Sequence, residues 1–326
     1  MNHSLRTALL GVCALALAAV PARAGKWDMP LAYAASNYHS RNAVKFAGAV
    51  KKNSGGRIDI VTHPGGSLFK GGEIFRAVRT GRAPIGERLI SALGDESPLF
   101  EIDALPFLAT SLEDARKLHR ASLPVLRDLL AKKGVRMLYA VPWTPQGLYS
   151  RKPVRTVADM KGVKFRAYNA ITARLATLMG AIPTKIEAAE LTRAFATGVA
   201  EAMISSSSTG YDRKIWEHVR YWYDIQAWVP KNMVIVNARA WDGLDDAGRK
   251  ALSDAAAAAE KVGWAEARRL AGWYSEQLAG NGMTVGPPGA ALAREFHTLG
   301  KTMMTEWLKR AGADGKAVID AYKAMR

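Results

Sequence analysis

Cysteine is almost absent from this chain, whose single residue of that type is Cys13. Cys13 lies in the first 24 residues, which have the pattern of an export signal, so the expected mature chain contains no cysteine. Disulfide bonds, thiolate nucleophiles and cysteine-based metal sites are therefore excluded from it. The sequence also lacks the GxSxG, HExxH, GxxxxGK[ST] and GxGxxG motifs of common hydrolases and nucleotide-binding enzymes, so we expect no enzyme.

Long apolar segments are scarce as well. The only extended one, residues 9–20, is shorter than the roughly 20 residues of a membrane-spanning helix. It follows the positive charge of Arg6, and an A-x-A cleavage motif stands at residues 22–24. We therefore predict a signal peptide over residues 1–24, cleavage after Ala24, and export as a soluble periplasmic protein.

Acidic residues are few relative to basic ones: 46 Lys and Arg against 29 Asp and Glu give a net charge of +17. The basic residues are scattered among acidic and apolar positions, without a basic block or an interleaved aromatic platform. We interpret the charge as a solvated surface that attracts anionic solutes, and we expect no nucleic-acid partner. The six histidines are spaced too widely for a local metal site, so no metal or cofactor is expected.

Two stretches of the chain share one order of elements. Residues 74–87, IFRAVRTGRAPIGE, and residues 191–204, LTRAFATGVAEAMI, both read as helix, Thr-Gly turn and strand, and each follows another helix and strand. Such repeats predict an α/β fold of two similar lobes, each a mostly parallel sheet flanked by helices. Ligands bind beyond the carboxyl ends of such strands, which here would face one cleft.

The lobes are connected by two strand-like segments broken by prolines, residues 135–154 and 226–237. They predict a hinge at about 142–150 and 226–232. The helical stretch 245–280 would be about 50 Å long, enough to span both lobes. Two further helical segments, 289–311 and 315–325, end the chain.

These crossings define the expected lobes. The first comprises residues 25–144, completed by about 232–262, and the second comprises residues 145–231, completed by about 263–326.

Arg166 is the clearest candidate for a ligand contact. In KGVKFRAYN, residues 161–169, apolar and polar side chains alternate as in a strand, and Asn169 is a suitable N-cap for the helical stretch that follows. Arg166 would lie beside the N-terminus of that helix, where its guanidinium and the free N–H groups both favour a negative charge. The nearest later carboxylate in the sequence is Glu187, so the partner of Arg166 is expected to be a ligand.

Five segments together resemble the solute-binding proteins of TRAP transporters, the DctP family. They are HPGGSLFKGGEIFRAVRTGRAPIGE, LFEIDALPFLA, ADMKGVKFRAYN, MGAIPTKIEAAEL and ATGVAEAMISSSSTGYD, in the family's order over nearly all of the mature chain. The resemblance implies a two-lobed clamshell that binds an organic acid, performs no chemistry, and presents its ligand to small and large sodium-coupled membrane subunits. A periplasmic sensor for a membrane receptor is the alternative, and a monomer is expected.

The resemblance also implies roles for single residues. Arg166 matches the carboxylate-binding arginine, Asn169 a polar ligand contact, and Glu87 an acidic or polar position facing the cleft. Ser205 stands where sialic-acid-binding members carry asparagine. Gln146 stands where those members carry a second arginine, so we expect a smaller monocarboxylate: a hydroxy, oxo, lactam or aromatic acid. Glu87, facing the ligand, would reject a second carboxylate.

Other candidates follow from their places near the expected cleft. They are Ser206 beside Ser205, Tyr168 beside Arg166, Trp143 and Trp228 on the crossing segments, and Asn37 and His39 after the first strand. Most of these candidates, and Glu87, have an alternative role. The serines and Asn37 can cap helices, the aromatic residues can belong to the core, and Glu87 can form an internal ion pair with Arg88.

Overall fold

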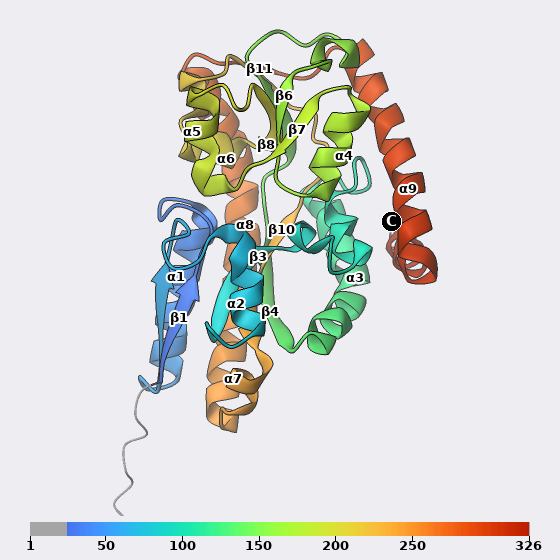
Figure 1. Cartoon of the computed structure of the whole chain (residues 1–326). Coiled ribbons are helices and arrows are strands. Elements are labelled where there is room, and N and C mark those ends of the chain that lie inside the picture. The colour runs from blue at the N-terminus through green and yellow to red at the C-terminus, as the bar shows by residue number, and fades with distance from the viewer. Residues whose placement is uncertain (1–24, 326) are drawn as a thin grey trace, which may run out of the picture.

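The computed structural model describes residues 25–325, and the signal peptide expected over residues 1–24 lies outside this range. Two lobes are stacked along the long helix α8 (Asp246–Gly280) (Figure 1). The chain builds most of the first lobe, crosses to the second, returns for one strand, and follows α8 to the second lobe again. The predicted α/β fold of two lobes with a spanning helix is confirmed.

The strands form three sheets in the described part of the chain. The first lobe has the pair β1 (Gly25–Pro30) and β2 (Ile58–His63), and a sheet ordered β3 (Ile85–Leu89), β10 (Lys231–Asn237), β4 (Val135–Pro142). The second lobe has a sheet ordered β11 (Thr284–Gly286), β9 (Tyr221–Tyr223), β5 (Gln146–Ser150), β8 (Ala202–Ser206), β6 (Lys164–Ala167), β7 (Ile182–Lys185).

These sheets are mixed, whereas the sequence predicted mostly parallel ones. Strand β10 is antiparallel to β3 and β4, and β5 is antiparallel to β8 and β9. Strands β4, β5 and β10 enter or leave a lobe at the crossings, so a strand that returns to a lobe runs against the one that left it. The pairs β1–β2, β6–β7, β6–β8 and β9–β11 are parallel, because helical connections bring the chain back to the same end of the sheet.

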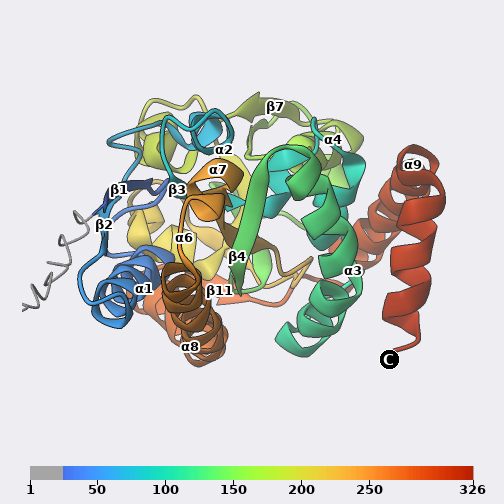
Figure 2. The ribbon, with the colours of Figure 1, turned by 90° about the horizontal axis from the view of Figure 1, so that it is seen from below.

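Helices cover the faces of these sheets (Figure 2). They are α1 (Tyr38–Asn53), α2 (Ile74–Arg79), α3 (Leu112–Lys132), α4 (Ala170–Leu178), α5 (Leu191–Ala196), α6 (Ser207–Asp212), α7 (Ala238–Asp242), α8, and α9 (Ala290–Lys323). The two repeated segments form α2–β3 and α5–β8. In each, the glycine after the helix, Gly81 or Gly198, has a φ of +77° or +71°, the left-handed conformation that ends a helix at little cost for glycine alone.

Helix α8 is continuous and braces both lobes. It packs against α1 and β4 in the first lobe and against α6 and β11 in the second. Where α8 crosses β4, a Cβ on Gly263 would lie 2.4 Å from Cγ2 of Val141. Glycine therefore allows the helix to approach the strand closely.

Helix α9 lies along the outer edge of the molecule (Figure 1). A non-helical Gly312 (φ +61°) divides it into two segments, close to the two predicted from the sequence. It packs against α3 of the first lobe and against α4 of the second. The exact lobe boundaries stay a prediction. Each helix within residues 25–325 is too short or too polar to cross a membrane.

The two crossing segments run side by side. The N–H of Trp143 donates to the carbonyl of Pro230 at 2.8 Å, and that of Gln146 to the carbonyl of Trp228 at 3.0 Å. They thus form one narrow connection that is hydrogen-bonded along its length. Both crossing segments lie within the stretches predicted from the sequence to connect the lobes. Their bending as a hinge stays a prediction.

A buried ion pair fixes the returning segment to the first lobe. Nζ of Lys231, the first residue of β10, lies 3.1 Å from Oδ2 of Asp103 in the 3₁₀-helix η3 (Pro98–Ala104). The backbone N–H of Lys231 donates to the same oxygen at 2.9 Å. Both side chains are buried, so the returning crossing ends at a fixed point in the first lobe.

Candidate ligand-binding site

A pocket lies between the lobes beside the crossing segments. It is lined by Tyr33, Arg88, Leu89, Trp143, Gln146, Arg166, Tyr168, Glu187, Ala188, Ser205, Ser206, Thr209 and Pro230. Six of the predicted contact residues are in this lining: Arg166, Gln146, Ser205, Ser206, Tyr168 and Trp143. Their contact with a ligand stays a prediction.

Arg166 is held rigidly while part of its guanidinium stays free. It lies on β6, directly before Asn169 caps α4, as the sequence predicted. Its Nε donates to the carbonyl of Ile186 at 3.0 Å, and its guanidinium carbon lies 5.0 Å from the centre of the Tyr168 ring. Within residues 25–325 Arg166 has no ion pair and its two terminal nitrogens have no hydrogen-bond partner, so they can bind a carboxylate in two parallel bonds.

A chain of hydrogen bonds supports the wall beside Arg166. Nε1 of Trp228 donates to the hydroxyl of Tyr168 at 3.0 Å, and that hydroxyl donates to Oε1 of Gln146 at 3.2 Å. Nε2 of Gln146 donates to the carbonyl of Thr144 at 3.0 Å. Trp228 therefore lies behind the lining and orients Tyr168, which lines the pocket.

The two predicted serines differ in their surroundings. The hydroxyl of Ser206 accepts from the N–H of Thr209 at 3.1 Å and caps α6, which is the alternative role considered from the sequence. The hydroxyl of Ser205 has no hydrogen-bond partner among the described residues and lines the pocket. Ser205 is thus the serine with its hydroxyl free for a ligand.

Asn169 and Asn37 lie outside the lining and connect the lobes instead. Nδ2 of Asn169 donates to the hydroxyl of Ser91 at 2.9 Å, while its Oδ1 caps α4. Nδ2 of Asn37 donates to Oδ2 of Asp212 at 2.5 Å, while its Oδ1 caps α1. The cap at Asn169 is the one predicted from the sequence, and the cap at Asn37 is the alternative role considered for that residue. The contacts with the opposite lobe join residues far apart in the sequence, and no local pattern signals them.

Arg88 was missed as a pocket residue. It lies on β3, buried, and its two terminal nitrogens lie 3.3 and 3.4 Å from the carboxylate oxygens of Glu187, across the cleft. The pocket therefore holds two arginines, rather than the one inferred from Gln146. Neighbouring residues of a strand point to opposite faces, so Glu87 and Arg88 do not form the ion pair considered from the sequence. The same alternation could have shown that only one of the two side chains faces the cleft.

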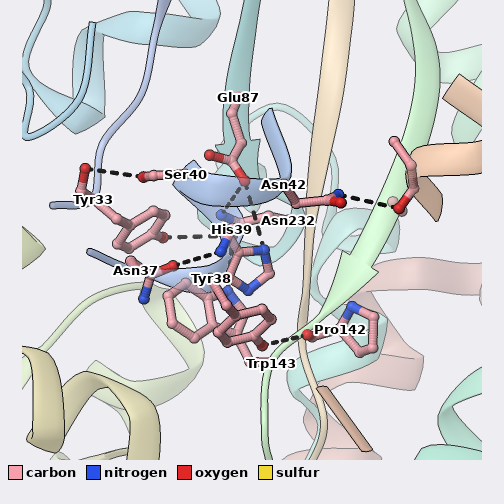
Figure 3. A network of polar contacts seen from close by, with 12 residues as sticks. Tyr33, Asn37, Tyr38, His39, Ser40, Asn42, Glu87, Pro142, Trp143 and Asn232 are labelled. Carbon is pink, nitrogen blue, oxygen red and sulfur yellow. Dashed lines mark hydrogen bonds and ion pairs between the residues drawn. The ribbon is translucent and has the colours of Figure 1, made fainter. Parts of the chain in front are cut away.

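Glu87 and His39 are not in the pocket lining and belong to a network of polar contacts beside Trp143, which lines the pocket (Figure 3). Oε1 of Glu87 accepts from Nδ2 of Asn232 at 3.0 Å and lies 3.6 Å from Nδ1 of His39. Oδ1 of the same Asn232 accepts from Nε1 of Trp143 at 2.9 Å. Trp143 also packs on His39, with ring centres 4.1 Å apart. Glu87 and His39 thus support the aromatic wall from behind, and a direct ligand contact stays a prediction.

Burial decides the protonation of this pair. Burial raises the pKa of Glu87 to about 7, although the hydrogen bond from Asn232 acts in the opposite direction. Burial also lowers the pKa of His39 well below its usual value. Glu87 therefore keeps its proton at mildly acid pH, and burial favours the neutral form of His39.

We expect Glu87→Gln to change the pH dependence of stability. The unfolded chain releases the Glu87 proton near pH 4.5 and the folded chain near pH 7, so the native state binds more protons in between and stability falls as pH rises through this window. The variant, neutral throughout, should match the wild type at pH 4.5 and exceed it by about 3 kcal/mol at pH 8.

Urea denaturation of both proteins at the two pH values checks this prediction. The opposite contribution of His39, which favours the folded state as pH rises towards 6.5, is present in both and cancels in the difference. An equal difference at the two pH values would contradict it.

Two α/β lobes, a narrow double crossing and a pocket with a free guanidinium define a clamshell ligand-binding protein. Residues 32–310 match the family model described as bacterial extracellular solute-binding protein, family 7, the DctP family. The chain belongs to this family. It is a TRAP solute-binding protein for small organic acids and not an enzyme, as the sequence predicted.

Solved structures are similar over nearly the whole chain. A marine-metagenome TRAP solute-binding protein specific for pyroglutamate is 52% identical, with 93% of this chain and 100% of that one covered and a TM-score of 0.92. DctP6 of Bordetella pertussis, an extracytoplasmic solute receptor binding pyroglutamic acid, is 46% identical, with 92% and 100% covered and a TM-score of 0.90.

A more distant relative is the C4-dicarboxylate-binding periplasmic protein DctP of Rhodobacter capsulatus. It is 25% identical over 268 residues, which are 79% of each chain.

Proposed function

We propose that this chain is the periplasmic solute-binding subunit of a TRAP transporter and that its ligand is pyroglutamate, a small lactam monocarboxylate. The observation that carries the proposal is the state of Arg166: buried, hydrogen-bonded to the carbonyl of Ile186, and without a carboxylate partner among residues 25–325. A buried guanidinium with two free nitrogens is suited to one carboxylate in bidentate contact.

The rest of the lining suits a compact ring with few polar groups. The aromatic rings of Trp143, Tyr33 and Tyr168 form apolar walls, and the free hydroxyl of Ser205 can hydrogen-bond a lactam group. Of the acids expected from the sequence, a lactam acid is further supported by the pyroglutamate bound to two proteins about half identical to this chain.

Delivery to small and large sodium-coupled membrane subunits is the second part of the proposal. It is supported by membership of the family and by the contacts between lobes, which hold the cleft closed in this structure. Bending at 142–150 and 226–232 would open it.

Pyroglutamate should raise the melting temperature of the protein starting at Gly25. At about a thousandfold over its dissociation constant, a ligand that binds only the folded state adds about 4 kcal/mol to the free energy of unfolding. This corresponds to a rise of several degrees. A thermal-shift panel of pyroglutamate together with mono-, di-, hydroxy-, oxo- and aromatic acids measures it.

The matched control ligand is the carboxamide of pyroglutamate, which has the same ring without the charge and should give no shift. A shift with the carboxamide as large as that with the acid would contradict the role of Arg166. A panel without any shift would overturn the proposed function.

A further inference from the structure

The two arginines of the pocket differ in one respect: Arg88 has a carboxylate partner within the protein and Arg166 has none among residues 25–325. Glu187 faces Arg88 with both oxygens, one for each terminal nitrogen. Its side chain is 26% exposed and that of Arg88 is 6% exposed. The carboxylate therefore stands at the edge of the pocket, with the guanidinium behind it.

The side chain of Glu187, a residue of the second lobe, fits into a space in the first lobe. Glu187 precedes the 3₁₀-helix η5 (Ala188–Glu190) of the second lobe, but its side chain does not cap that helix. It reaches the first lobe at Gly71, where an added Cβ would lie 2.6 Å from Oε2 of Glu187 and 3.1 Å from Nη1 of Arg88. The backbone there leaves room for this ion pair because it lacks a side chain.

The three charges surround one small space. Arg88, Glu187 and Arg166 line the same pocket. The pKa of Tyr33, raised mainly by burial, is also shifted by the charges of Arg88, Glu187 and Arg166. With Arg88 neutralised by Glu187, one positive charge is left for a ligand. A second ligand carboxylate would meet the negative charge of Glu187 and find Arg88 occupied.

We propose that Glu187 determines the charge class of the ligand. By binding Arg88 it restricts the pocket to monocarboxylates, and its neutralisation turns Arg88 into a second carboxylate site opposite Arg166. This inference rests on the proposed function, because it explains why the same pocket would accept pyroglutamate and refuse a dicarboxylate of equal carbon number. One of its measurements, the gain of glutarate binding in a Glu187 variant over the wild type, can be read whether or not pyroglutamate binds.

Titration calorimetry with glutarate tests the role of Glu187. Glutarate has the five-carbon chain of pyroglutamate and a second carboxylate in place of the lactam. The wild type should bind it at least about 100-fold more weakly than pyroglutamate. Glu187→Gln should bind glutarate at least tenfold more tightly than the wild type does, and the ratio of glutarate to pyroglutamate affinity should rise by the same factor. The double variant Glu187→Gln with Arg88→Gln should lose the gain.

Glu190→Gln is the matched control. It removes the same charge three residues away, from an exposed side chain outside the pocket, and should leave both affinities unchanged. Glu187→Ala repeats the test without an amide, so that poor folding of one variant does not prevent a result.

The outcomes separate the two proposals. A Glu187→Gln protein that binds both acids more weakly by one common factor would overturn the inference, since Glu187 would then only tie the lobes together. Wild-type binding of glutarate as tight as that of pyroglutamate would overturn it too. A wild type that binds no monocarboxylate would refute the proposed function, while a gain of glutarate binding in Glu187→Gln would still support the role of Glu187.

Discussion

Replacement of Arg166 by alanine should remove tight binding of the ligand. We expect the dissociation constant to rise at least about 100-fold, or about 3 kcal/mol, because the ligand carboxylate would enter a closed pocket without its partner. The protein itself should stay folded, since Arg166 has no internal ion pair in the described chain and donates a single hydrogen bond, to Ile186. Calorimetric titration with pyroglutamate measures the loss.

Two further variants make this test specific. Arg166→Lys should also bind poorly, because an ammonium group cannot make the two parallel bonds of a guanidinium. Arg174→Ala removes an equal charge from the exposed face of α4, where the arginine pairs with Glu306, and should leave the affinity unchanged. Near-normal affinity of Arg166→Ala would show that the carboxylate is bound elsewhere.

The second large effect concerns stability and the ion pair of Asp103 with Lys231. Asp103→Ala should lower the free energy of unfolding by about 3–5 kcal/mol, because it leaves a buried ammonium without a counter-ion. It also removes the acceptor of the Lys231 backbone N–H. Burial raises the pKa of Asp103 although the charge of Lys231 acts against the shift, so desolvation of the carboxylate outweighs the pairing at this site. Urea denaturation monitored by circular dichroism measures the loss.

A double variant distinguishes the loss of the ion pair from the cost of leaving one buried charge unpaired. Asp103→Leu combined with Lys231→Met removes both charges and should be far more stable than Asp103→Ala, since replacing a buried pair by apolar side chains is often nearly neutral. Asp103→Asn keeps an acceptor for the backbone N–H and should lie between the two. Equal stability of Asp103→Ala and the wild type would contradict the account.

Local patterns predicted the parts of the fold and site that depend on neighbouring residues. The alternation around Phe165 and the cap at Asn169 identified the strand and helix that place Arg166. The Thr-Gly turns at Gly81 and Gly198 identified the repeated units. In these cases the same few residues both carry the signal and form the structure.

Features formed by distant residues could not be predicted in this way. Glu87 was chosen over Arg88 because the resemblance placed it in the cleft, yet which face of β3 meets the second lobe depends on the packing of that lobe. The antiparallel pairing of β10 depends on the path of the chain through both lobes. The contact of Asn169 with Ser91 joins residues 78 positions apart.

The contacts between the lobes have a consequence for the timing of ligand release. Arg88 with Glu187, Asn169 with Ser91, and Asn37 with Asp212 close the cleft at three separate points. Each contact has an equivalent in water once the lobes part, so its net contribution at equilibrium is small. A bound molecule can nevertheless leave only after all three contacts between the lobes have been broken. The contacts between the lobes therefore prolong the residence time of the ligand more than they raise its affinity. A partner that pulls the lobes apart would determine when the ligand is released.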